Sequence, residues 1–181
     1  VCLDIIQRIL VDHFGFRLFH VMGMTDVDDK IIKRAAERGV SPLELSSYYE
    51  DDFWRDMRAL NVRPPHASTR VTEHIPEVVQ YIDQLVQHNF GYRTEDGSVY
   101  FDVRRLGSRY GKLKPGASAG DVEVEPHHPL KRDERDFALW KGTNPNQVHN
   151  GGNTTVACAA HSDELSWPSP WSETGRPGWH I

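Results

Sequence analysis

The first part of the chain carries helical and strand-like hydrophobic patterns in turn. Apolar residues recur at helical spacing over residues 3–14 and stop at Gly15, which predicts a helix. Residues 16–22 then form a short, nearly continuous apolar run, which is typical of a strand buried on both faces of a sheet. A second helix is predicted from its capping residue Asp28 to its terminator Gly39. A helix that leads into a buried strand favours an α/β fold.

Two further helices follow with clear boundary signals. Residues 41–44 read Ser-Pro-Leu-Glu, which places a cap, a first-turn proline and a reciprocal glutamate at a helix start. The apolar stripe of this helix reaches Leu60, and Pro64 with Pro65 closes the segment. A further helix is predicted from a candidate cap at Thr72 to the neighbourhood of Gly91.

The second half of the chain mixes strands with segments of low apolar content. Asp96-Gly97 between residues 91–93 and 99–103 predicts a two-residue β-hairpin. Residues 114–135 have no apolar period, which predicts an exposed loop. Ordered structure is predicted to resume at residues 136–141. Residues 144–166 are polar and rich in glycine and threonine, so we predict a flexible insertion.

Size and charge narrow the functional classes. The chain has 181 residues and a mass of 20.7 kDa, which fits one domain or one domain with an appendage. Its net charge of -5 argues against a domain that holds nucleic acid by positive charge alone, although local basic patches are compatible with it. Two cysteines form no disulfide framework, and no apolar run predicts a membrane span. Because the chain opens on Val1 in a helical pattern, we expect it to be a fragment.

Three clusters suggest chemistry. Residues 25–33 lie where a predicted strand meets a helix, a common ligand position in α/β sheets, although plain helix capping explains the acidic residues on the local pattern alone. Cys158 with His161, and likewise His127-His128, are too few for a metal site, so we interpret both as parts of polar loops. Residues 168–181 combine Gly, Pro and Trp, which fits either a ligand-binding surface or a rigid turn with tryptophan packed inward.

Five ordered blocks resemble those of the cysteinyl-tRNA synthetase family, and the likeness extends over nearly the whole chain. The blocks are TDVDDKIIKRA (25–35), VYFDV (99–103), YGKL (110–113), DFALWK (136–141) and GRPGWHI (175–181). The flanking sequence RVTEHIP (70–76) is most similar to the mitochondrial form of animals.

The resemblance implies a fragment of a class I synthetase with a Rossmann-like catalytic domain and a mainly helical connective insertion. Residues 1–40 would end the first half of the catalytic domain, residues 41–135 would form the insertion, and residues 136–181 would re-enter the catalytic domain, with the unusual loop at 144–166. The segment of about 149–166 and the sequence Trp171-Ser172-Glu173 depart from the family pattern.

Residue roles also follow from the resemblance. It implies that Thr25 contacts the amino acid substrate and that Trp179 lines the cysteine and adenylate pocket. The stretch Lys30, Ile31, Ile32 and Lys33 matches a family signature. The implied zinc tetrad of two Cys, one His and one Glu and the ATP motifs lie outside residues 1–181, so we assign no catalytic or metal-binding residue here and expect no turnover from this chain alone.

The implied activity is that of a cysteine–tRNA ligase. It would use cysteine, ATP with Mg²⁺ and tRNA(Cys), with Zn²⁺ in the full-length enzyme, in the mitochondrial matrix or alternatively the cytoplasm. Two alternatives stay open: a related ligase that transfers cysteine to an amino sugar, and a truncated interaction module without catalysis.

Overall fold

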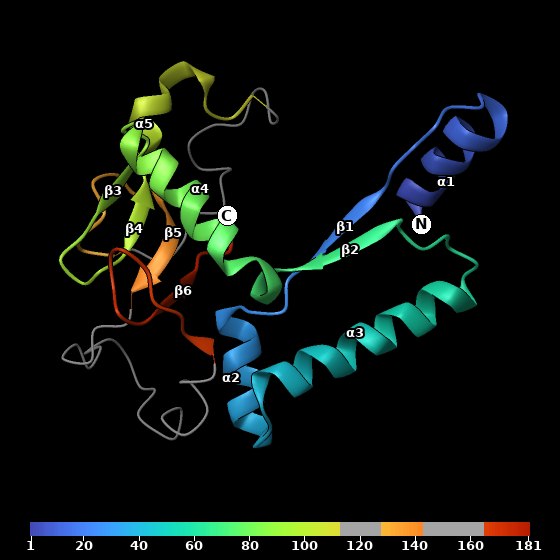
Figure 1. Cartoon of the computed structure of the whole chain (residues 1–181), viewed down its shortest axis with the longest axis horizontal. Helices are drawn as coiled ribbons and strands as arrows, with labels where there is room; N and C mark the ends of the chain where they lie inside the picture. Colours follow the sequence, from blue (N-terminus) through green and yellow to red (C-terminus); the bar gives the residue numbers. More distant parts are fainter. Residues whose placement is uncertain (113–127, 143–164) are drawn as a thin grey trace. The chain divides into compact units, whose positions relative to one another are not determined.

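The computed structural model describes residues 1–112, 128–142 and 165–181, which belong to two compact units (Figure 1). Unit 1 contains residues 1–74, and the described residues from 75 onward belong to unit 2. One unit has a parallel pair of strands and the other an antiparallel sheet, so the fold is mixed α/β. In the described residues no helix has both the length and the apolar content needed to cross a membrane.

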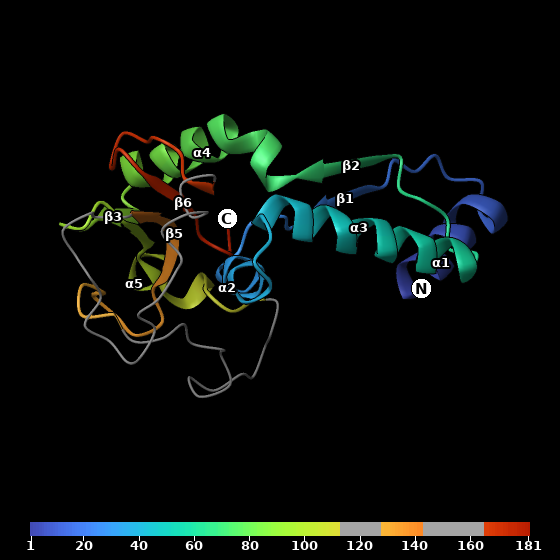
Figure 2. The same cartoon turned by 90° about the horizontal axis from the view of Figure 1, so that it is seen from below.

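Unit 1 contains two parallel strands joined by two helices. β1 (Val21–Met24) pairs with β2 (Ala67–Arg70) from Val21 opposite Ala67 to Met24 opposite Arg70. The remaining elements of the unit are α1 (Cys2–Arg8), its π-helical continuation η1 (Ile9–His13), α2 (Asp29–Arg38), α3 (Pro42–Ala59) and the 3-10 turn η2 (Val71–His74). Figure 2 shows the two strands side by side along their length. Parallel strands need a crossover connection, which α2 and α3 provide.

Both predicted ends of α2 and the predicted start of α3 are confirmed. The Asp28 carboxylate accepts a hydrogen bond from the Lys30 N–H at 3.3 Å, and Gly39 ends α2 in the left-handed conformation at φ 65°. At the start of α3 the Ser41 N–H donates to the Glu44 carboxylate at 3.3 Å, which is part of the capping box. Local sequence sets these boundaries because the capping partners lie within three residues of each other.

The predicted strand at residues 16–22 is wrong in position and burial. β1 begins only at Val21, and the side chains of Phe19 and Val21 are 73% and 51% exposed. The physical reason lies on the partner strand, where Pro64 and Pro65 precede β2 and have no N–H to donate to a longer ladder. Pairing therefore starts after the His66 N–H donates to the His20 carbonyl at 2.8 Å.

The predicted first helix is confirmed, but its apolar residues do not face a core within the described chain. Leu3, Ile6 and Ile9 are between 48% and 66% exposed, whereas Asp4 and Gln7 are buried. Asp4 accepts hydrogen bonds from the Arg8 side chain at 2.8 Å and from the Arg63 N–H at 3.0 Å. These contacts hold α1 to the segment that leads into β2, and the donors lower the pKa of Asp4, chiefly through the hydrogen bond from Arg8.

Unit 2 is built on a four-stranded antiparallel sheet in the order β3-β4-β5-β6. The strands are β3 (Gly91–Arg93), β4 (Val99–Phe101), β5 (Phe137–Gly142) and β6 (Gly175–Pro177). The helices are α4 (Ile75–Gln87), α5 (Val103–Leu106) and the 3-10 turn η3 (Gly107–Arg109). In Figure 2, α4 lies along one side of this sheet and α5 on the other. The ordered structure predicted for residues 136–141 is confirmed, because β5 occupies this segment.

Two boundary predictions in this region need correction. Thr72 does not cap a helix, because it lies in η2, donates its hydroxyl to Asp26, and α4 begins only at Ile75. The hairpin has a three-residue connection, residues 95–97, because the Thr94 N–H donates to the Ser98 carbonyl at 2.9 Å. Gly97 adopts φ 78°, which such a three-residue loop requires at its last position.

A buried carboxylate organises the centre of unit 2. The side chain of Asp136, which is 1% exposed, accepts hydrogen bonds from the Tyr92 hydroxyl at 2.8 Å, the Val103 N–H at 2.9 Å and the Asp133 N–H at 3.1 Å. The Tyr92 oxygen in turn accepts from the Arg132 N–H at 2.8 Å. Burial is the main cause of the raised pKa of Tyr92, so this hydroxyl stays protonated and can donate.

Several sequence predictions lie wholly or partly outside the described residues. Cys158, His161 and His127 are outside them, as are most of the segments predicted as loop and insertion. At the end of the predicted flexible insertion, however, Leu165 is only 1% exposed, so the prediction of a flexible insertion is wrong for that residue. The division at residues 40 and 135 stays a prediction.

Candidate functional site

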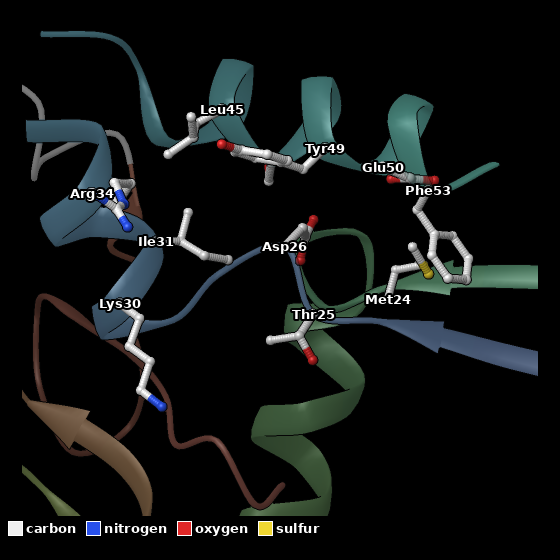
Figure 3. Close-up of a pocket in the computed structure, with 11 residues that line it drawn as sticks. Met24, Thr25, Asp26, Lys30, Ile31, Arg34, Leu45, Tyr49, Glu50 and Phe53 are labelled. Atoms are coloured by element: carbon white, nitrogen blue, oxygen red, sulfur yellow. The ribbon is translucent and has the colours of Figure 1, made fainter. Parts of the chain in front are cut away.

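A pocket of about 400 Å³ lies in unit 1 beyond the end of β1. Its walls are mainly apolar and come from α2, α3 and the residues that follow β1, as Figure 3 shows. The lining residues are Met24, Thr25, Asp26, Lys30, Ile31, Arg34, Leu45, Ser46, Tyr49, Glu50 and Phe53. This is the position at which open α/β folds bind ligands, next to the carboxyl ends of parallel strands.

The structure brings three of the sequence-predicted site residues to this pocket. Thr25, Lys30 and Ile31 line it, whereas Ile32 and Lys33 do not. The helical period explains the split, because positions 30, 31 and 34 share a face of α2 and positions 32 and 33 lie elsewhere. In Figure 3 the hydroxyl of Thr25 and the amine of Lys30 both point to the side away from Tyr49 and Leu45. The α3 side of the site is therefore mainly apolar, with Ser46 and Glu50 as its polar members, and Thr25 and Lys30 add polar groups at the opposite edge.

Two of the acidic residues in this cluster have structural partners. Asp28 caps α2, which agrees with the capping interpretation of the sequence. Asp26 is 6% exposed and accepts hydrogen bonds from both the N–H, at 3.2 Å, and the hydroxyl of Thr72. These two carboxylates hold the backbone on either side of Val27.

An ion pair at the edge of the pocket was not predicted from the sequence. The Arg70 guanidinium donates to both oxygens of Glu50, at 2.8 and 2.6 Å, and to Glu73 at 3.0 Å. The hydrogen bond from Arg70 is the main cause of the lowered pKa of Glu50, and the hydrogen bond to Glu50 is the main cause of the raised pKa of Arg70. Glu50 and Arg70 lie 20 residues apart, so no local spacing indicates the pair.

Trp179 lies in unit 2 and is 59% exposed. The N–H of Gly178 donates to the Leu139 carbonyl at 2.8 Å, which fixes the backbone just before Trp179 against β5. The Trp179 ring meets His180 edge-on with centroids 4.8 Å apart. Trp171 in the same cluster instead packs edge-on against Trp140 at 6.1 Å, so the inward-packed interpretation applies to Trp171 and the exposed one to Trp179. A pocket shared by Thr25 and Trp179 stays a prediction.

The described residues do not fit a zinc site. Within residues 1–112, 128–142 and 165–181, no three His, Cys, Asp or Glu side chains are grouped so that they could hold a metal ion. His128 instead lies with its Nε2 3.9 Å from the Asp96 carboxylate. Burial raises the pKa of Asp96, but hydrogen bonds from Thr94 and Ser98 outweigh it and keep that pKa below its usual range.

Comparison with known proteins defines the class. Residues 1–181 match the family described as tRNA synthetases class I (C) catalytic domain, and the chain therefore belongs to this family. Among its relatives, the chain is 45% identical over 178 residues to a probable mitochondrial cysteine–tRNA ligase of Xenopus tropicalis. It is 40% identical over 192 residues to the cytoplasmic cysteine–tRNA ligase of Dictyostelium discoideum, and 41% identical over 185 residues to a cysteine–tRNA ligase of Methanococcus maripaludis strain C7. The resemblance to cysteinyl-tRNA synthetases is thus confirmed.

The matched region is a part of each relative. The alignments cover 98%, 100% and 100% of this chain but only 28%, 26% and 34% of the three relatives. The chain thus spans about a third of their length or less.

Proposed function

We propose that the protein containing this chain is a cysteine–tRNA ligase. The cysteine carboxylate would attack the α-phosphate of ATP, forming cysteinyl adenylate and releasing pyrophosphate, and a ribose hydroxyl of tRNA(Cys) would then displace AMP. The observation that carries the proposal is the family match over all 181 residues, together with the names of the relatives. We expect ATP to act with Mg²⁺.

Thr25 and Trp179 are the residues we assign to the cysteine substrate. The Thr25 side chain lies just past β1, is exposed, and points away from the apolar wall of the pocket, so its hydroxyl can reach a polar group of a ligand. The exposed Trp179 ring is a flat apolar surface that can form a wall beside a small substrate. Lys30 adds a positive charge near Thr25, which suits an anionic substrate or intermediate.

Selectivity for cysteine over serine needs more than pocket size, because a difference of one small group is worth only about 1 to 3 kcal/mol. Zinc in the full-length enzyme would supply this selectivity by binding the thiolate. That part of the proposal rests on the family resemblance, and no role of Thr25 or Trp179 depends on it.

Substitution of these two residues tests the assignment in the full-length protein. Thr25→Val keeps the side-chain volume and removes one hydrogen-bond partner, so we expect cysteine activation to weaken by about 1 to 3 kcal/mol in kcat/KM. Trp179→Ala removes an apolar wall and should cost at least as much. The measurement is cysteine-dependent exchange of pyrophosphate into ATP. Wild-type kinetics for Thr25→Val would remove Thr25 from the substrate site, and the same result for Trp179→Ala would remove Trp179.

We further propose that the protein works in mitochondria. The identity of 45% to a mitochondrial vertebrate relative supports this location, while 40% identity to a cytoplasmic relative keeps the cytoplasm as the alternative. Cell fractionation with an antibody to the native protein distinguishes them, because mitochondrial protein would be protected from added protease by intact membranes.

A further inference from the structure

The residue that follows Thr25 is fastened to a segment far along the chain. Asp26 accepts two hydrogen bonds from Thr72, which lies 46 residues later in η2. The ladder between β1 and β2 ends at Met24 opposite Arg70, so Thr25 follows the last paired residue of β1. The bonds between Asp26 and Thr72 therefore continue the connection between the two chain segments just past the sheet.

The chain on either side of Thr72 is restrained by the interactions of Arg70 and Glu73. Arg70, two residues before it, forms the two-pronged pair with Glu50 of α3, and Arg70 also donates to Glu73, the residue after Thr72. Charge-assisted hydrogen bonds of this kind are strong and directional. The backbone around Thr72 is thus restrained within unit 1. The hydrogen bonds from Thr72 to Asp26 in turn restrain the backbone of the neighbouring residue Thr25.

We infer that Thr72 is a positioning residue for the substrate-binding hydroxyl of Thr25, acting through the Asp26 carboxylate. This inference rests on the proposed function, in which Thr25 contacts cysteine. Thr72 does not line the pocket, so it acts without touching the ligand. Without the Thr72 hydroxyl, the Asp26 carboxylate keeps the backbone N–H of Thr72 as its one hydrogen-bond donor among the described residues, and the segment carrying Thr25 gains freedom. A small misplacement of a substrate-contacting group can lower the rate by one or two orders of magnitude.

A double-mutant cycle in the full-length protein tests this role. The variants are Thr72→Val, which removes the hydroxyl at constant volume, Thr72→Ser, which retains it, Thr25→Val, and the pair T25V/T72V. Thr69→Val is the matched control, because Thr69 lies in β2, pairs with Gly23 through its backbone, and is absent from the pocket lining. The readouts are KM for cysteine, KM for ATP and kcat in pyrophosphate exchange, with the melting temperature of each variant.

We expect Thr72→Val to lower kcat/KM for cysteine about tenfold while KM for ATP stays within about twofold. Thr72→Ser and Thr69→Val should stay within about twofold of wild type. The pair T25V/T72V should match Thr25→Val alone, because Thr72 has no effect once the hydroxyl it positions is gone.

Other outcomes distinguish a failure of the positioning role of Thr72 from a failure of the proposed substrate-binding role of Thr25. If Thr25→Val lowers activity and Thr72→Val does not, or if their effects multiply in the pair, the positioning inference is overturned and the role of Thr25 stands. An equal loss toward cysteine and ATP with a lower melting temperature shows that Thr72 serves only stability, which also overturns it. If Thr25→Val is neutral, the proposed role of Thr25 fails, and the inference fails with it.

Discussion

Asp136→Ala should destabilise unit 2 by about 3 kcal/mol or more, the largest effect we expect from a single side chain. The change leaves three donors without their acceptor, namely the Tyr92 hydroxyl and the N–H groups of Val103 and Asp133. Each buried donor left unsatisfied costs about 1 to 3 kcal/mol. The Asp136 side chain is itself almost fully buried, so water cannot easily replace it without rearrangement.

Urea unfolding followed by tryptophan fluorescence measures this change. Of the five tryptophans only Trp54 lies in unit 1, so the signal reports mainly on unit 2. Glu134→Ala is the matched control, because Glu134 is exposed and two residues away, and its effect should stay within about 0.5 kcal/mol. Equal midpoints for Asp136→Ala and Glu134→Ala would contradict the central role of Asp136.

Gly178→Ala should also destabilise unit 2, by about 2 to 3 kcal/mol. A Cβ atom at position 178 would overlap the carbonyl oxygen of Ala138 and lie 2.6 Å from its carbonyl carbon. The obstacle is the backbone of β5, so a simple rotamer change cannot relieve it, and overpacking of this kind costs about 1 to 3 kcal/mol or more. The glycine of the Gly-Trp-His-Ile block is thus explained by its close approach to β5.

Gly23→Ala provides the comparison for this substitution. A Cβ atom at Gly23 meets nothing within 4 Å, and its backbone is outside the left-handed region. Because Gly23 lies in unit 1 and tryptophan fluorescence reports mainly on unit 2, unfolding of both variants is followed by far-ultraviolet circular dichroism, which reports on the helices and strands of both units. The midpoint should be lower for Gly178→Ala and unchanged or slightly higher for Gly23→Ala. A Gly178→Ala protein as stable as wild type would mean that the residues after β6 do not lie against β5 as described.

Features with local causes could be predicted from the sequence. The caps of α2 and α3 and the glycine that ends α2 depend on partners within one helical turn. Features with distant causes could not. The start of β1 depends on Pro64 and Pro65 beside the partner strand, and the role of Thr72 depends on Asp26, 46 residues away.

In the candidate site, too, features set by local sequence could be predicted and features set by distant residues could not. The resemblance implies a substrate contact for Thr25 and a family signature at residues 30–33. Thr25, Lys30 and Ile31 line the pocket, whereas Ile32 and Lys33 do not, and the substrate contact of Thr25 stays a prediction. The opposing wall from α3 was visible only as an apolar stripe that included Tyr49 and Phe53, since nothing in the spacing says which residues a helix faces. The pair between Glu50 and Arg70 and the burial of Asp136 needed the tertiary structure, because charged side chains are usually exposed.

The most direct test of the account is the ATP-dependent attachment of labelled cysteine by the full-length protein, offered tRNA(Cys) and an amino sugar together. A cysteine–tRNA ligase should attach the labelled cysteine to tRNA(Cys) and release one AMP and one pyrophosphate for each cysteine attached. When labelled serine is offered in place of labelled cysteine, little label should be attached. Label on the amino sugar and none on tRNA(Cys) would identify the related ligase instead. No attachment to either acceptor, with tRNA(Cys) bound but unchanged, would contradict an enzymatic role and favour a non-catalytic binding module.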